Sequence, residues 1–136
     1  MEKIKEILKN AKTIAIIGCS NNPSKAAHRI PKYLQEEGYN IIPVNPNHDE
    51  ILGEKSYKAI SEIPQNIKID IINIFRPSKD IKALIPDIKK RYESIKDIKL
   101  IWLQEGIHSK EAKEFAKENN IEFIQSFCIY KFHASL

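Results

Sequence analysis

Five short runs of consecutive apolar residues constrain the fold of this chain more than any other feature. They are rich in isoleucine and aromatic residues and occupy residues 13–18, 39–45, 67–75, 98–104 and 120–126. A strand with one face in water alternates apolar and polar residues, whereas a strand that is buried on both faces is apolar continuously. The runs therefore predict the buried strands of a parallel sheet.

The segments around these runs carry the spacing of amphipathic helices. Apolar residues three and four positions apart predict helices over residues 4–11, 24–38, 79–95 and 109–119. Gly38 is suited to follow the end of a helix, and the Ser109 hydroxyl is suited to cap the start of one. Pro31 either opens the main helix of its segment at the first turn or kinks it. Residues 46–64 predict a long connection with one short helix.

Strands that alternate with helices need crossover connections, which are right-handed in nearly all parallel sheets. The sequence thus predicts an α/β fold, namely a Rossmann-like, doubly wound, five-stranded parallel sheet with helices on both faces. We expect residues 1–136 to form a single domain, because no linker, repeat or low-complexity tract interrupts them.

Charge and composition indicate which kinds of partner and which cellular compartment to expect. The net charge of +4 favours an anionic ligand, but the 22 basic residues are spread among 18 acidic ones, so nucleic acid is not expected. No run approaches the ~20 apolar residues of a membrane span. The two cysteines form no CxxC pair and the four histidines form no HxxxH pair. We therefore expect a cytoplasmic protein without a metal site.

The loop after the first predicted strand has the place of a dinucleotide-binding loop but lacks two of its glycines. Gly18 permits a tight turn, whereas Ser20 and Pro23 stand where the second and third glycines are expected. Backbone N–H groups at the start of the following helix can hold phosphate oxygens, and Lys25 and Arg29 add positive charge. A phosphorylated ligand is favoured, with a purely structural turn as the alternative.

The residue at the end of the second predicted strand argues against NAD. A dinucleotide enzyme usually has Asp or Glu there, which accepts a hydrogen bond from the ribose 2′-hydroxyl. Here Asn45 stands at this position, followed by Pro46. An adenine nucleotide whose ribose carries a phosphate therefore fits better than NAD.

Three stretches together resemble a known family. They are "GCSNNPSKAAHRIPKYLQEEGYNIIPVNP", "IFRPS" and "WLQEGI", in the order and spacing of the small stand-alone CoA-binding proteins. That family is similar to the N-terminal CoA-binding domain of the succinyl-CoA synthetase α subunit, and the resemblance covers roughly residues 10–133. It implies that the chain binds coenzyme A or an acyl-CoA as a non-catalytic protein.

The resemblance also implies a set of ligand-binding residues. The phosphate loop follows the first strand, the turn after the second strand faces the adenine and the phosphorylated ribose, and residues after the third and fourth strands line the path of the pantetheine arm. The implied residues are Gly18, Ser20, Asn21, Asn22, Pro23, Lys25, Arg29, Asn45, Pro46, His48, Arg76, Pro77, Gln104, Glu105 and Gly106. Apart from the resemblance, His28 in the loop is a further candidate, because its ring can hydrogen-bond a phosphate.

The chain departs from the family pattern at three places. The synthetases have a lysine after the second strand, near the CoA phosphates, where Asn47 and His48 stand here. The small proteins commonly end in Asp-Arg-Cys with a later Glu-His, whereas residues 126–128 read Ser-Phe-Cys and residues 132–133 read Phe-His. The phosphorylated histidine of the synthetases lies in a second domain, so ligase activity without a partner is not expected.

Two other classes of function stay open on the sequence alone. One is an NAD(P)-binding, oxidoreductase-like domain, and the other is a Rossmann shell without a ligand that serves as a protein-interaction module. Phe127, Tyr130 and Phe132, expected to be exposed, suit contact with a second copy in a possible homodimer. Cys19 and Trp102 are expected to fill the core.

Overall fold

The five predicted strands form one parallel sheet in the computed structural model, which describes residues 1–136. They are β1 (Thr13–Ile17), β2 (Asn40–Val44), β5 (Ile71–Ile74), β6 (Leu100–Leu103) and β7 (Glu122–Ile124). Their order is β2-β1-β5-β6-β7, and every neighbouring pair is parallel. The order changes direction between β1 and β5, so the predicted doubly wound sheet is confirmed.

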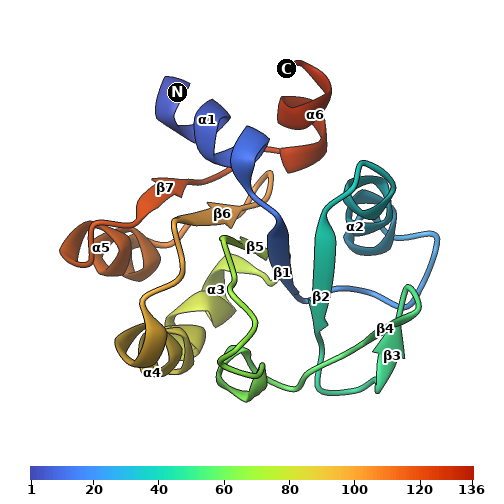
Figure 1. The fold of residues 1–136 in the computed structure, drawn as a ribbon, viewed down its shortest axis with the longest axis horizontal. Coiled ribbons are helices and arrows are strands. Elements are labelled where there is room, and N and C mark those ends of the chain that lie inside the picture. The colour runs from blue at the N-terminus through green and yellow to red at the C-terminus, as the bar shows by residue number, and fades with distance from the viewer.

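Helices cover both faces of the sheet (Figure 1). One face packs against α1 (Glu2–Asn10), α2 (Ala26–Glu36) and α6 (Ile129–Ala134). The other packs against α3 (Ser78–Ile81), α4 (Ile85–Ile95), α5 (Lys110–Glu118) and the 3₁₀ helix η1 (Ile60–Glu62). Alternate residues of a strand reach opposite cores, as Ile14 and Ala15 of β1 do. The two cores explain why the strands are apolar at consecutive positions.

The predicted helix ends are confirmed at two positions. Gly38 follows the last turn of α2 with φ +101°, a backbone conformation that favours glycine. The Ser109 hydroxyl accepts a 3.1 Å hydrogen bond from the Ala112 N–H at the start of α5. The predicted helix over residues 79–95 is divided into α3, the 3₁₀ helix η2 (Lys82–Leu84) and α4. Pro86 lies in the first turn of α4, where its missing N–H costs the helix no hydrogen bond.

Pro31 lies inside α2 and not at its first turn, so the first of its two predicted placements is wrong. Because proline has no N–H, the Ala27 carbonyl four residues earlier has no helical donor at this position. The Ser20 N–H donates to that carbonyl instead, at 2.9 Å. The carbonyl that Pro31 leaves free is thus used for a hydrogen bond between α2 and the loop that precedes it.

Two short elements were not predicted. Residues 46–64 contain a hairpin of β3 (Glu50–Ile51) and β4 (Glu54–Lys55), beside the expected short helix η1. Its turn residues Leu52 and Gly53 both have positive φ, and the Leu52 carbonyl accepts a hydrogen bond from Gln35 of α2. The second missed element is α6, whose six residues are too few for a helical period to be recognised.

The C-terminal aromatic residues do not all lie on the surface. Phe127 and Tyr130 are exposed as expected, but Phe132 is only 7% exposed. Its ring packs edge-on against Trp102, with the ring centres 5.2 Å apart. The prediction that Phe132 is available to a second copy is therefore wrong, because α6 turns this side chain into the core. Trp102 is fully buried, as expected.

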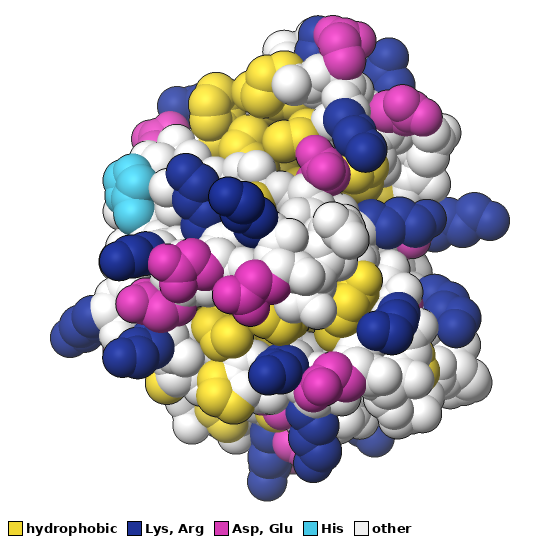
Figure 2. All heavy atoms as spheres, turned by 90° about the vertical axis from the view of Figure 1, so that its left-hand side faces the viewer, with side chains coloured by type: hydrophobic (Ala, Val, Ile, Leu, Met, Phe, Trp, Pro, Cys, Tyr) yellow, Lys and Arg dark blue, Asp and Glu magenta, His cyan; other side chains and the backbone are white.

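The charged side chains on the surface are of both signs. On the face shown in Figure 2, Lys and Arg side chains are interspersed with Asp and Glu, and hydrophobic side chains gather in the upper part. The positive charge on this face therefore does not form a continuous basic patch. None of the helices has the length and apolar character that crossing a membrane requires.

Candidate functional site

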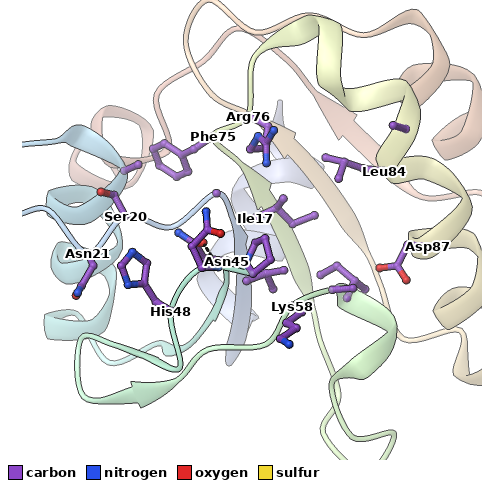
Figure 3. Close-up of a pocket in the computed structure, with 18 of the residues that line it drawn as sticks. Ile17, Ser20, Asn21, Asn45, His48, Lys58, Phe75, Arg76, Leu84 and Asp87 are labelled. Atoms are coloured by element: carbon purple, nitrogen blue, oxygen red, sulfur yellow. Dashed lines mark hydrogen bonds between the residues drawn. The ribbon is translucent and has the colours of Figure 1, made fainter.

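A cleft of about 890 Å³ opens at the carboxyl ends of β1, β2 and β5 (Figure 3). The strand order changes direction here, and doubly wound sheets bind their ligands at such a point. The volume lies within the range of ~300–1,000 Å³ found for small-molecule sites. Nine of the predicted ligand-binding residues line the cleft: Gly18, Ser20, Asn21, Asn22, Lys25, Asn45, Pro46, His48 and Arg76.

The loop between β1 and α2 is held by its own hydrogen bonds. The Ser20 hydroxyl accepts from the Asn22 N–H at 3.0 Å, and the Asn22 side chain accepts from the Ser24 N–H and hydroxyl. Gly18 has φ +84°, and a Cβ atom there would lie 3.1 Å from Cδ of Arg76. The positive φ therefore favours glycine at this turn, and any other residue would also displace the Arg76 side chain.

The N-terminus of α2 leaves several donors free. No side chain caps it at Lys25, and its first turn carries no acidic residue. The backbone N–H groups of Ala26 and Ala27 in its first turn, and that of Asn21 in the preceding loop, make no hydrogen bond within the protein. Free N–H groups at the positive end of a helix dipole can bind the oxygens of a phosphate group.

Asn45 lines the cleft, but its side chain already has partners in the protein. Its amide nitrogen donates to the Cys19 carbonyl at 2.9 Å, and its oxygen accepts from the Asn47 N–H at 2.9 Å. The side chain thus ties the end of β2 to the loop after β1. A carboxylate at this position could not donate to Cys19, and so the usual NAD-binding residue does not suit this loop.

One corner of the cleft is apolar and was not predicted. Val44, Ile60 and Leu84 line it from β2, η1 and η2, together with Ile88 of α4. Sequence reasoning placed no ligand contact on η1 or α4, because the packing of α4 against η1 is a long-range contact. Two charged residues of this region, Lys58 and Asp87, also line the cleft. The Asp87 carboxylate accepts hydrogen bonds from the Ser61 N–H and hydroxyl and so joins α4 to η1.

Four other predicted residues lie near the cleft without lining it: Pro23, His28, Arg29 and Pro77. Nδ1 of His28 lies 2.7 Å from the Ser20 carbonyl oxygen, and the Arg29 guanidinium donates to the Ser24 carbonyl. Both side chains therefore support the loop from behind. Pro77 precedes the first residue of α3. Direct ligand contact by these four residues stays a prediction.

The three predicted residues after β6 also lie outside the cleft. Gln104 is buried, and its side-chain oxygen accepts from Asn73 at 3.2 Å and from the Ile129 N–H at 3.0 Å. Glu105 is exposed and lies 3.4 Å from Lys131, while the Gly106 N–H donates to the Ser126 hydroxyl. The contacts of Gln104 hold α6 against the sheet, whereas pantetheine contact by this segment stays a prediction.

Cys19 is fully buried, as expected, and burial raises the pKa of its thiol from 9.0 to about 12. Since the thiolate is the reactive form, we expect Cys19 in the folded protein to react with Ellman's reagent at pH 8 at least ~1,000-fold more slowly than an ordinary thiol. Mass spectrometry of labelled peptides would check this, with the urea-unfolded protein as the control in which Cys19 and Cys128 both react. Rapid labelling of Cys19 in the folded state would contradict the prediction.

The fold and the cleft are those of the Rossmann-like class, in which phosphorylated ligands bind at the point where the strand order reverses. The family described as "CoA binding domain" matches residues 12–134. The chain therefore belongs to this family, and the family predicted from the sequence is confirmed.

Two similar proteins of known sequence differ in length. An uncharacterized protein of Bacillus subtilis, YneT, is 37% identical over 132 residues, which are 97% of this chain and 93% of that protein. The α subunit of an ADP-forming acetate–CoA ligase II of Pyrococcus furiosus is 33% identical over 110 residues, which are 80% of this chain and 23% of the subunit. The chain thus spans about a quarter of the ligase subunit.

Solved structures agree with the fold. A hypothetical protein from Pyrococcus horikoshii has a TM-score of 0.88 at 32% identity, covering 99% of this chain and 90% of that chain. A protein from Thermus thermophilus has a TM-score of 0.89 at 31% identity, covering 98% of this chain and 96% of that one. Both likenesses cover nearly the whole chain.

Proposed function

We propose that this chain binds coenzyme A or an acyl-CoA in the cleft and does not itself catalyse a reaction. The observation that carries the proposal is the uncapped N-terminus of α2, where the free N–H groups of Ala26 and Ala27, with that of Asn21 in the preceding loop, lie beside a cleft at the end of the sheet. Membership of the CoA-binding domain family supports a ligand of the CoA type.

The parts of CoA correspond to the parts of the cleft. The diphosphate takes the loop of residues 18–25, where backbone donors and Lys25 supply positive potential. The adenine ring takes the apolar corner formed by Val44, Ile60 and Leu84. The ribose lies between them, near Asn45 at the end of β2, as in other nucleotide-binding sheets of this class.

A non-catalytic role is supported by the polar groups in the cleft. The Ser20 hydroxyl accepts a hydrogen bond from a backbone N–H, and no histidine ring or carboxylate bonds to it. The Asp87 carboxylate is engaged by Ser61, and Cys19 points into the core. The nucleophile and general base that covalent catalysis needs are thus not found side by side here.

Calorimetric titration tests the proposal, with CoA and acetyl-CoA run beside NAD and NADP. We expect CoA to bind with a micromolar Kd, which corresponds to about 8 kcal/mol. We expect NAD to bind at least ~10-fold more weakly, because Asn45 cannot accept from the ribose as a carboxylate does. Tighter binding of NAD, or no heat with any of the four compounds, would overturn the proposal. Hydrolysis or transfer of the acetyl group by the chain alone would overturn its non-catalytic part.

A further inference from the structure

Lys58 is a cleft residue that no sequence motif identifies. It is exposed and lines the cleft, yet its ammonium group makes no salt bridge or hydrogen bond within the protein. The other two cations of the cleft differ from it. Lys25 belongs to the diphosphate loop, and Arg76 is paired with Asp80 at 3.0 Å. Lys58 is therefore the one cleft cation outside the diphosphate loop that lacks an anionic partner in the protein.

The backbone around Lys58 is anchored on both sides. Before it, the Tyr57 N–H donates to the Pro43 carbonyl at 3.0 Å, and the Tyr57 carbonyl accepts from the Asn45 N–H at 2.9 Å. After it, Ser61 is held by the Asp87 carboxylate. The backbone at Lys58 is thus held beside the carboxyl end of β2, although 13 positions separate it from Asn45 in the sequence. The anchored backbone keeps the ammonium group of this side chain within reach of the cleft.

The position of Lys58 relative to the other parts of the cleft indicates which part of a nucleotide it contacts. In Figure 3, Asn45 and Ile17 separate Lys58 from Arg76. Lys58 lies between His48 and Asp87. A nucleotide with its diphosphate on the α2 N-terminus and its base in the apolar corner places its ribose by the end of β2. A phosphate on that ribose carries close to two negative charges at neutral pH and needs a cation there.

We propose that Lys58 binds a phosphate group on the ribose of the ligand and so determines that the cleft prefers a 3′-phosphorylated nucleotide. The inference rests on the proposed function and adds to it the residue that distinguishes CoA from 3′-dephospho-CoA. Lys58 comes from the segment before η1, and not from the turn at Asn47 and His48 that directly follows β2. The site therefore obtains its ribose-phosphate cation through tertiary packing.

The test measures Kd for CoA and for 3′-dephospho-CoA by calorimetry in the wild-type chain and in the variants Lys58→Gln and Lys58→Arg. We expect the wild-type chain to prefer CoA by about 10- to 100-fold, the effect of one charge-assisted hydrogen bond. Lys58→Gln should bring the two Kd values within about threefold of each other by weakening CoA alone. Lys58→Arg should keep most of the preference, because it keeps the charge.

The matched control is Lys55→Gln, which removes an exposed lysine at the end of β4, three residues before Lys58; this lysine lies over the Tyr57 ring and does not line the cleft. It should leave the ratio of the two Kd values unchanged. A wild-type chain that binds both compounds equally well, or a Lys58→Gln variant that keeps the full preference, would overturn the inference while CoA binding itself stands. Equal losses in Lys55→Gln and Lys58→Gln would assign the effect to overall charge and overturn it too. No binding of either compound would overturn the proposed function together with the inference.

Discussion

Replacement of Arg91 by alanine is expected to lower the free energy of unfolding by about 3–5 kcal/mol, the largest effect that we expect of any single substitution on stability. The side chains of Arg91 and Asp97 are each 1% exposed and lie 3.1 Å apart. Removal of the guanidinium leaves the carboxylate buried without its counter-charge. Breaking such a pair costs much more than forming it contributes.

The cost extends beyond the ion pair, because Arg91 also binds the segment that precedes β5. Its guanidinium donates to the carbonyls of Ile63 at 2.6 Å and Ile67 at 2.5 Å. The Asp97 carboxylate accepts from the Ile69 N–H at 2.8 Å. The network therefore holds the chain between η1 and β5, and η1 forms one wall of the cleft.

Chemical denaturation followed by circular dichroism would measure this effect. The control is Lys90→Ala, one residue earlier on the exposed side of α4, which should change the stability by less than about 0.5 kcal/mol. The double variant Arg91→Met with Asp97→Asn should recover part of the loss, because asparagine removes the buried charge and can still accept from Ile69. A loss below about 1 kcal/mol in Arg91→Ala would show that the network is not a main source of stability.

The isoleucine runs were enough to predict the fold, because a strand buried on both faces leaves a continuous apolar pattern in the sequence. Ile14 and Ile16 reach one core while Ala15 and Ile17 reach the other, so the last four residues of β1 all contribute to the pattern. The β3–β4 hairpin left no such pattern, since each of its strands has two residues and one residue of the hairpin, Ile51, is fully buried.

The residues of the candidate site were harder to predict from the sequence than the fold, because their roles depend on partners that are distant in the sequence. Residues of the first loop could be placed in the cleft because the loop lies next to its own strand and helix. Gln104 follows a strand in the same way, yet its side chain accepts hydrogen bonds from Asn73 and Ile129 and so has a structural role. Lys58 shows the converse, since it is an ordinary residue of a polar connection until the pairing of Tyr57 with β2 places it in the cleft.

Replacement of Ala27 by aspartate is expected to weaken CoA binding by at least ~100-fold, or about 2.7 kcal/mol, without loss of stability. Ala27 lies in the first turn of α2 and lines the cleft. Two unit charges about 4 Å apart near a protein surface interact by roughly 4 kcal/mol, so a carboxylate here repels the diphosphate. The same carboxylate interacts favourably with the helix dipole, by about 0.3–1 kcal/mol. Affinity and stability should therefore change in opposite directions.

The asparagine variant at the same position separates charge from size. Ala27→Asn adds a side chain of the same shape without charge, and we expect it to weaken CoA binding by less than about 10-fold. Calorimetry for the affinity and thermal unfolding without ligand for the stability complete the comparison. If aspartate and asparagine weaken CoA binding equally, the side chain acts by blocking the cleft. The anion-binding role of the α2 N-terminus then loses its support. If neither changes the affinity, the diphosphate does not lie there. A loss with aspartate alone, in a chain that unfolds at the same or a higher temperature, is the result that only a phosphate at the uncapped helix explains.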